Sequence, residues 1–312
     1  MNLKILLKKI LKRVYFIFYL NRKKRIYRFL THISLNKNPN FLRLSSEPFV
    51  SGDTFRKFSD HIFDETKKID PKKVSKNDFV FLKTDLIEIF FEEYHPHIEN
   101  KYNLISHNSD RNLTQELYNF SDEKIITWFA QNLCIKKTNT LLPLPIGLEN
   151  LRYLNNGILK DFKTVFPAKN KFILSSFNQG TNPSERINLL NLSSEIDNID
   201  VINYLNHKDY VEGLSAYMYN LCPVGNGSDT HRLWESLMVG TIPIMIKSDF
   251  SLNFLEIGIP ILLINEWNDL KNLGSDYLYE NYTNLSGKET TDKYVSFIFW
   301  REYLKKNFPS IL

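Results

Sequence analysis

The sequence is short of cysteine, and this shortage excludes several kinds of small scaffold. Its 312 residues include two cysteines, Cys134 and Cys222, and neither has a neighbour at a metal-ligand spacing. A disulfide framework is therefore excluded, and a reducing compartment fits best. With 43% hydrophobic and 24% charged residues, the chain is also not a disordered polymer. Its length predicts two domains or one large domain.

Long apolar runs are missing as well. The longest uncharged stretch near the start is Val14–Asn21, whereas a membrane span needs about 20 apolar residues. Val14–Leu20 is just long enough for the apolar part of a secretory signal, but Arg22-Lys23-Lys24-Arg25 follows it in place of a cleavage site. A transmembrane anchor is therefore disfavoured, and we expect a cytoplasmic protein.

Residues 1–30 form a basic segment. They hold ten of the 40 Lys and Arg residues and no acidic residue, which leaves 30 basic against 35 acidic residues elsewhere. Apolar residues interleaved with lysines are typical of a basic amphipathic helix that lies on an anionic membrane surface. A first helix that packs on its own domain is the alternative. Nucleic-acid binding is disfavoured, because no recognised nucleic-acid module follows the segment.

The rest of the chain alternates short apolar runs with helical patterns, which predicts parallel α/β sheets. The pattern stops in the polar stretch 149–170 and then restarts, so we predict domains at 31–155 and 156–290. A C-terminal helix at 291–312 is expected to cross back to the first domain. The expected strands are Phe79–Leu82, Asn103–Ser106, Ile125–Phe129, Phe172–Phe177, Val201–Tyr204, Asn220–Pro223, Thr241–Ile246 and Ile261–Ile264.

The most informative stretch is Asn220–Asp249, in which a glycine loop and a helix connect two expected strands. Gly225-Asn226-Gly227 removes Cβ atoms where a backbone can approach a ligand, and the helix that follows offers unpaired N–H groups to an anion. His231 and Arg232 in the first helical turn oppose the helix dipole, which a bound pyrophosphate would offset. Glu235 shares their helix face and can accept both hydroxyls of a ribose. The alternative is an ordinary surface helix, capped by Ser228 or Asp229, in which Glu235 pairs with Arg232.

The segment Leu221-Cys222-Pro223-Val224-Gly225-Asn226-Gly227-Ser228-Asp229-Thr230-His231-Arg232-Leu233-Trp234-Glu235-Ser236-Leu237, with Gly240-Thr241-Ile242-Pro243-Ile244, resembles the donor-binding region of exostosin-like glycosyltransferases. The resemblance is strong over about 30 residues and general elsewhere. It implies a GT-B-like fold, in which two Rossmann-like domains face a central cleft and the second one binds a nucleotide diphosphate sugar. Glu235 would then hold the ribose. The other implied donor-binding residues are Arg186, Gly225, Asn226, Gly227, Asp229, Thr230, His231 and Arg232.

Paired aspartates are a third absence. No Asp-x-Asp occurs in the chain, which disfavours a GT-A enzyme, where carboxylates hold a divalent ion against the diphosphate. The helix dipole and arginines would replace the metal, so we predict no metal and no cofactor. Arg186 follows the first strand of the second domain and can face the cleft, although an ordinary surface arginine is equally consistent with its position.

A proton acceptor for the attacking hydroxyl is expected from the first domain. Asp53 lies in the polar loop after Val50, and His107 and Asp110 follow the strand Asn103–Ser106, whose carboxyl end should face the cleft. Asp53 and Asp110 can also be helix caps. Inversion and retention at the sugar both stay open.

These observations predict a glycosyltransferase that moves a sugar from a nucleotide diphosphate to a hydroxyl of a glycan or lipid-linked acceptor. We expect it to act at an anionic membrane surface reached through residues 1–30. Two alternatives are a nucleotide-sugar epimerase or hydrolase on the same fold and a non-catalytic nucleotide-binding scaffold. The full set of glycines, arginine and glutamate disfavours the scaffold.

Overall fold

A computed structural model describes residues 43–153, 156–157, 161–162, 168–204, 206–286 and 291–307. The basic segment 1–30 lies outside these residues. Within them no helix is long and apolar enough to cross a membrane.

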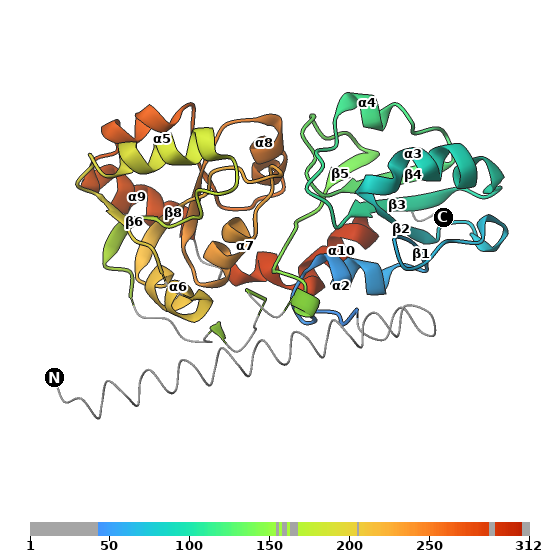
Figure 1. Ribbon diagram of the computed structural model, residues 1–312, viewed down its shortest axis with the longest axis horizontal. Helices are drawn as coiled ribbons and strands as arrows, with labels where there is room; N and C mark the ends of the chain where they lie inside the picture. Colours follow the sequence, from blue (N-terminus) through green and yellow to red (C-terminus); the bar gives the residue numbers. More distant parts are fainter. Residues whose placement is uncertain are drawn as a thin grey trace.

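The first domain is built on a five-stranded parallel sheet whose strands follow one another in chain order (Figure 1). The edge strand β5 lies in the segment 141–147, whose prolines cannot donate the backbone hydrogen bonds that a central strand needs. The strands are β1 His61–Phe63, β2 Phe79–Lys83, β3 Tyr102–His107, β4 Ile125–Ala130 and β5 Leu141–Pro143. The short helices are α2 Gly52–Phe58, α3 Ile87–Ile89 and α4 Gln115–Tyr118.

The second domain has a second parallel sheet, in the order β10-β9-β8-β6-β7. Since β7 and β8 flank β6 on opposite sides, the chain reverses direction across the sheet between β6 and β8, and ligands of such sheets bind at that point. The strands are β6 Lys171–Ser175, β7 Ile199–Val201, β8 Tyr217–Leu221, β9 Ile242–Ile246 and β10 Leu262–Ile264. The helices are α5 Pro183–Ser193, α6 His207–Leu214, α7 His231–Met238, α8 Asp249–Glu256, α9 Ser275–Ser286 and α10 Phe297–Lys306.

The two parallel-sheet domains confirm the predicted GT-B-like α/β fold class. Several boundaries differ from the prediction. The strand expected at Val201–Tyr204 is Ile199–Val201, and the three-residue strand β1 has no counterpart in the prediction. After β2, residues 84–94 form a series of short helical turns, in which Ile89 is 42% exposed while Phe90 is buried.

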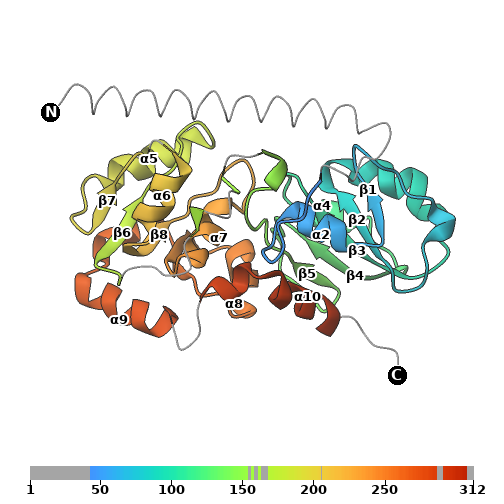
Figure 2. The same ribbon diagram turned by 90° about the horizontal axis from the view of Figure 1, so that it is seen from below.

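Helix α10 lies against both domains (Figures 1 and 2). The centre of its Phe297 ring lies 5.9 Å from that of Phe55 in the first domain, and the centre of its Trp300 ring lies 5.9 Å from that of Trp234 in the second. The chain before α10 is also tied to the first domain, since Val50 N–H donates to the Val295 carbonyl at 2.9 Å. One cluster of buried apolar side chains therefore runs from one domain into the other.

Candidate functional site

The loop between β8 and α7 contacts the first domain. The backbone N–H of Asp229 donates to Asn132 Oδ1 at 2.7 Å, and Ser228 N–H donates to Asn112 Oδ1 at 3.2 Å. Asn226 Nδ2 donates to Asp110 Oδ2 at 3.3 Å. The loop that resembles a ligand cradle is thus also the contact that joins the domains.

Gly227 serves this domain contact rather than a ligand. A Cβ atom there would lie 2.8 Å from Asn132 Nδ2 and 2.8 Å from the Asp110 carbonyl oxygen, both in the first domain. At Gly225 a Cβ would come no closer than 3.3 Å, to Arg186 Nη2. The expectation that both glycines make room for a ligand is therefore corrected: Gly227 makes room for the facing domain.

Asp229 is buried in the same contact. Its Oδ2 accepts the Ile146 N–H at 2.6 Å, and its Oδ1 accepts Trp234 Nε1–H at 2.8 Å. Burial raises the pKa of this carboxyl to about 7, although both hydrogen bonds oppose the rise. Asp229 thus links the first domain to the core of α7, and its oxygens are already occupied.

Helix α7 begins after the N-cap Thr230, so His231 and Arg232 occupy its first turn as predicted. Arg232 Nε donates to the Ser176 carbonyl at 2.9 Å, and its guanidinium lies 5.7 Å from the centre of the Phe177 ring. No carboxylate of the described residues lies within ion-pair distance of Arg232. Its charge is therefore available to an anion.

Arg232 and Glu235 line one cavity of about 600 Å³ beside the carboxyl end of β6. The buried Glu235 carboxylate accepts a hydrogen bond from His207 Nε2 at 3.2 Å. Burial lowers the pKa of His207, but Glu235 and then Asp161 raise it further than burial lowers it. The remaining lining residues are Asn156, Ser176, Phe177, Asn178, Gln179, Asn203, Tyr204, Asn206 and Tyr210.

Arg186 is placed differently from the prediction, because it is 4% exposed and does not line this cavity. Its guanidinium donates to the carbonyl oxygens of Asn178 at 2.8 Å and Val224 at 3.0 Å. Burial, and then the charge of Arg232, lower its pKa to about 10. Arg186 therefore holds the loop before Gly225 in place by hydrogen bonds and adds a positive charge beside Gly225.

A second cavity of about 370 Å³ lies where the first domain meets His231 of the second, and most of its lining residues are polar. Asp110 is exposed and lines it, as does His231 from the second domain. The other lining residues are Gly52, Asp85, Asn108, Ser109, Arg111, Gln131, Ile146, Asn150, Arg152 and Tyr153.

His107 does not reach this cavity. It is fully buried, its Nε2 lies 2.9 Å from the Pro145 carbonyl oxygen, and its Nδ1 accepts the Asn108 N–H at 2.7 Å. Burial lowers its pKa to about 4. Both ring nitrogens are used inside the domain, which leaves neither of them free to accept a substrate proton.

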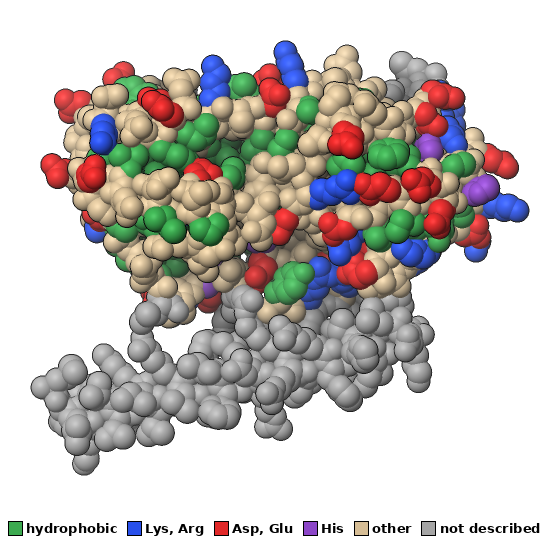
Figure 3. All heavy atoms as spheres, turned by 45° about the horizontal axis from the view of Figure 1, so that its top comes forward, with side chains coloured by type: hydrophobic (Ala, Val, Ile, Leu, Met, Phe, Trp, Pro, Cys, Tyr) green, Lys and Arg blue, Asp and Glu red, His purple; other side chains and the backbone are tan. Residues whose placement is uncertain are grey.

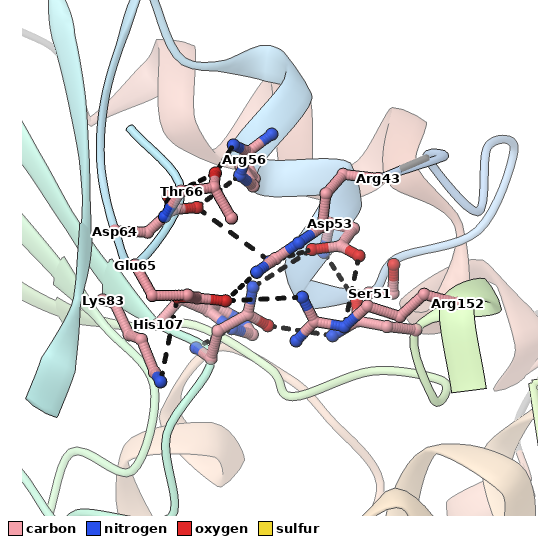
Figure 4. A network of polar contacts seen from close by, with 12 residues as sticks. Arg43, Ser51, Asp53, Arg56, Asp64, Glu65, Thr66, Lys83, His107 and Arg152 are labelled. Atoms are coloured by element: carbon pink, nitrogen blue, oxygen red, sulfur yellow. Dashed lines mark hydrogen bonds and ion pairs between the residues drawn. The ribbon is translucent and has the colours of Figure 1, made fainter. Parts of the chain in front are cut away.

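Asp53 is likewise fully buried, at the second position of α2 behind the N-cap Ser51. Figure 4 shows it within a network of charged side chains from several parts of the first domain. Arg43 Nη1 donates to its Oδ1 at 3.1 Å, and Arg152 Nε lies 3.8 Å from its Oδ2. The Asp53 carboxylate therefore neutralises arginine side chains inside the first domain.

Two residues that the sequence analysis did not identify contribute to the site: one contacts the motif loop from the facing domain, and the other forms a hydrogen bond with a cavity residue. Asn132 accepts from the motif loop, and His207 holds Glu235. Neither stands in a recognisable motif, so only the fold brings them to the site. Within the described residues no group of three or more His, Cys, Asp or Glu side chains is placed to hold a metal ion.

No protein-family model matches the chain, and no curated protein matches it. Among solved structures, the pneumococcal O-GlcNAc transferase GtfA with UDP and GlcNAc is 12% identical (TM-score 0.39), and the match covers 76% of this chain and 58% of that one. A trehalose-6-phosphate protein from E. coli with UDP-2-fluoro glucose is 8% identical (TM-score 0.47; 77% and 74% covered). A putative UDP-N-acetylglucosamine 2-epimerase from Listeria monocytogenes is 10% identical (TM-score 0.37; 75% and 74% covered). At these identities the likeness extends to the fold alone.

Proposed function

We propose that the protein is a glycosyltransferase of the exostosin-like kind that its motif resembles, acting on a nucleotide diphosphate sugar without a metal. The observation that carries the proposal is the pairing, in one cavity, of an arginine that has no carboxylate partner among the described residues and a buried carboxylate one turn further along α7. Arg232 fits a diphosphate, and Glu235 fits the two hydroxyls of a ribose. The position at the reversal point between β6 and β8 supports the same ligand.

The second cavity fits a hydroxyl-bearing acceptor. Carboxylates, amides and guanidinium groups line it, including Asp85, Asn150 and Arg152, and these groups form hydrogen bonds with sugar hydroxyls. It lies beside the first turn of α7, on the first-domain side of the donor cavity. A polar glycan therefore fits this cavity better than a lipid chain.

Both nucleotide contacts can be tested by calorimetric titration with UDP, GDP and CMP, in EDTA and in Mg²⁺. We expect one nucleoside diphosphate to bind, with the same affinity in EDTA. Arg232→Ala and Glu235→Ala should each weaken its binding by about 1–3 kcal/mol. Arg301→Ala and Glu302→Ala, at exposed positions of α10, are matched controls.

Two results would contradict the proposal. If Arg232→Ala and Glu235→Ala lower thermal stability equally and leave binding intact, the cavity does not hold the nucleotide. Binding that requires Mg²⁺ would mean that a metal, rather than Arg232, neutralises the diphosphate. Formation of a new glycoside, as against hydrolysis or epimerisation of the sugar, then separates a transferase from the alternative enzymes.

A further inference from the structure

His231 stands apart from the other residues of the motif because its ring is held by the first domain. His231 Nδ1 lies 2.7 Å from the Gly147 carbonyl oxygen. A carbonyl oxygen only accepts, so Nδ1 carries the proton in this hydrogen bond. In the neutral ring the other nitrogen, Nε2, then bears the free electron pair. No group of the described residues forms a hydrogen bond with Nε2.

The position of His231 also separates it from its neighbour Arg232. Successive helical residues point about 100° apart, and these two line different cavities: Arg232 the donor cavity, and His231 the polar cavity between the domains. A sugar whose diphosphate lies at Arg232 and whose acceptor lies in the polar cavity would meet that acceptor beside His231.

We infer that His231 Nε2 is the general base of the reaction, with the acceptor hydroxyl bound in the polar cavity. The inference rests on the proposed function. It moves His231 from the set of donor-binding residues to the acceptor side. It also replaces the first-domain candidates, since His107 and Asp53 are fully buried. Asp110 does line the cavity, but its side chain is exposed and accepts from Asn226.

The step balances without a further reactant. The acceptor oxygen forms a bond to the anomeric carbon while the bond from that carbon to the diphosphate oxygen breaks. The electron pair of the broken bond leaves with the nucleoside diphosphate, whose charge Arg232 offsets. The proton of the acceptor hydroxyl passes to His231 Nε2 and later to water. The Nδ1–H bond to Gly147 stabilises the imidazolium that forms.

The first test compares turnover with nucleotide binding. His231→Asn keeps an N–H donor for Gly147 but removes the base. Turnover is measured as release of nucleoside diphosphate from the nucleotide sugar that binds, with methyl glycosides or water as acceptor. We expect a loss of about 10²–10⁴-fold, with nucleotide affinity unchanged within about threefold. Imidazole added to His231→Ala should restore part of the rate, and His97→Asn, at an exposed histidine, should act as wild type.

The other outcomes are distinct. Turnover of His231→Asn within about threefold of wild type overturns the inference. Affinity that falls in step with turnover also overturns it, because His231 then binds the donor phosphate. Wild-type protein that binds no nucleotide instead overturns the proposed function, and the inference with it.

A second measurement decides the matter if the acceptors tried give no turnover. A ¹H–¹⁵N spectrum of the histidine rings, assigned by comparison with His231→Asn, reports which nitrogen carries the proton. We expect the neutral His231 ring in the Nδ1–H form, because Nδ1 donates to the Gly147 carbonyl oxygen. A ring protonated at Nε2 could not accept the hydroxyl proton, and this result would overturn the inference.

Discussion

Substitution of the two motif glycines by alanine separates the domain contact from the donor site. At Gly227 the new methyl group would lie 2.8 Å from both Asn132 Nδ2 and the Asp110 carbonyl oxygen. The carbonyl belongs to the backbone and cannot rotate away, so the facing domain has to move. At Gly225 the nearest atoms lie at 3.3 and 3.4 Å, and both belong to side chains, those of Arg186 and Thr230.

The magnitude follows from two opposing effects. An overpacked site costs about 1–3 kcal/mol, whereas alanine stabilises by about 0.4–1 kcal/mol because it restricts the unfolded chain. Neither glycine has a positive φ, so no backbone strain is added. Gly227→Ala should therefore destabilise by up to about 2.6 kcal/mol, and Gly225→Ala should change stability by less than about 1 kcal/mol in either direction.

Urea denaturation of both variants measures this difference, and small-angle scattering reports whether the domains separate. We expect Gly227→Ala to lower the free energy of unfolding and to widen the molecule, with nucleotide affinity nearly unchanged. Equal stability of the two variants would refute the assignment of Gly227 to the domain contact. If Gly227→Ala loses nucleotide affinity but keeps its stability, Gly227 makes room for the ligand, as the sequence suggested.

Two further predictions concern buried charges. Asp53→Asn removes one of three carboxylates beside the buried Arg43 and leaves Asp64 and Glu65 in place, so we expect a loss of about 1–3 kcal/mol in urea denaturation; a stable variant without turnover would instead make Asp53 a catalytic residue. The pKa of His207 is raised above 6.5 by Glu235 and Asp161, so its stabilising effect is complete at lower pH and is lost as pH rises through the folded-state pKa. The free energy of unfolding should thus fall as the pH rises above about 6.5, and His207→Gln should flatten that fall; an unchanged slope would contradict the assignment.

The strands were predictable where buried apolar residues run without interruption. Phe79–Leu82 and Ile125–Phe129 were found because both faces of a parallel strand are covered, and an apolar run results. The three-residue strand β1 is too short to show any period, and it is held by pairing with β2. The position of strand β7 was predicted wrongly. Its last residue, Val201, is apolar but 40% exposed, so an apolar residue at this position does not indicate a buried strand.

The site was predictable only where one helix carries it. The spacing of Arg232 and Glu235 fixes their shared face, so sequence reasoning could place them together. Whether a side chain of the first domain can act as the catalytic base depends on how deeply it is buried, and sequence spacing does not indicate burial. His107 ends a strand as expected, yet all six residues of β3 are buried, and its ring turns into the domain.

The motif loop has two roles that the sequence cannot separate. Its glycine, asparagine and aspartate residues contact the first domain, while the helix that it starts presents Arg232 to the donor cavity. Arg232 is oriented by Ser176 of its own domain, and His231 by Gly147 of the other. The relative position of the two side chains is therefore set by the domain contact itself. Any change that moves the domains apart should alter the proposed proton transfer before it alters nucleotide binding.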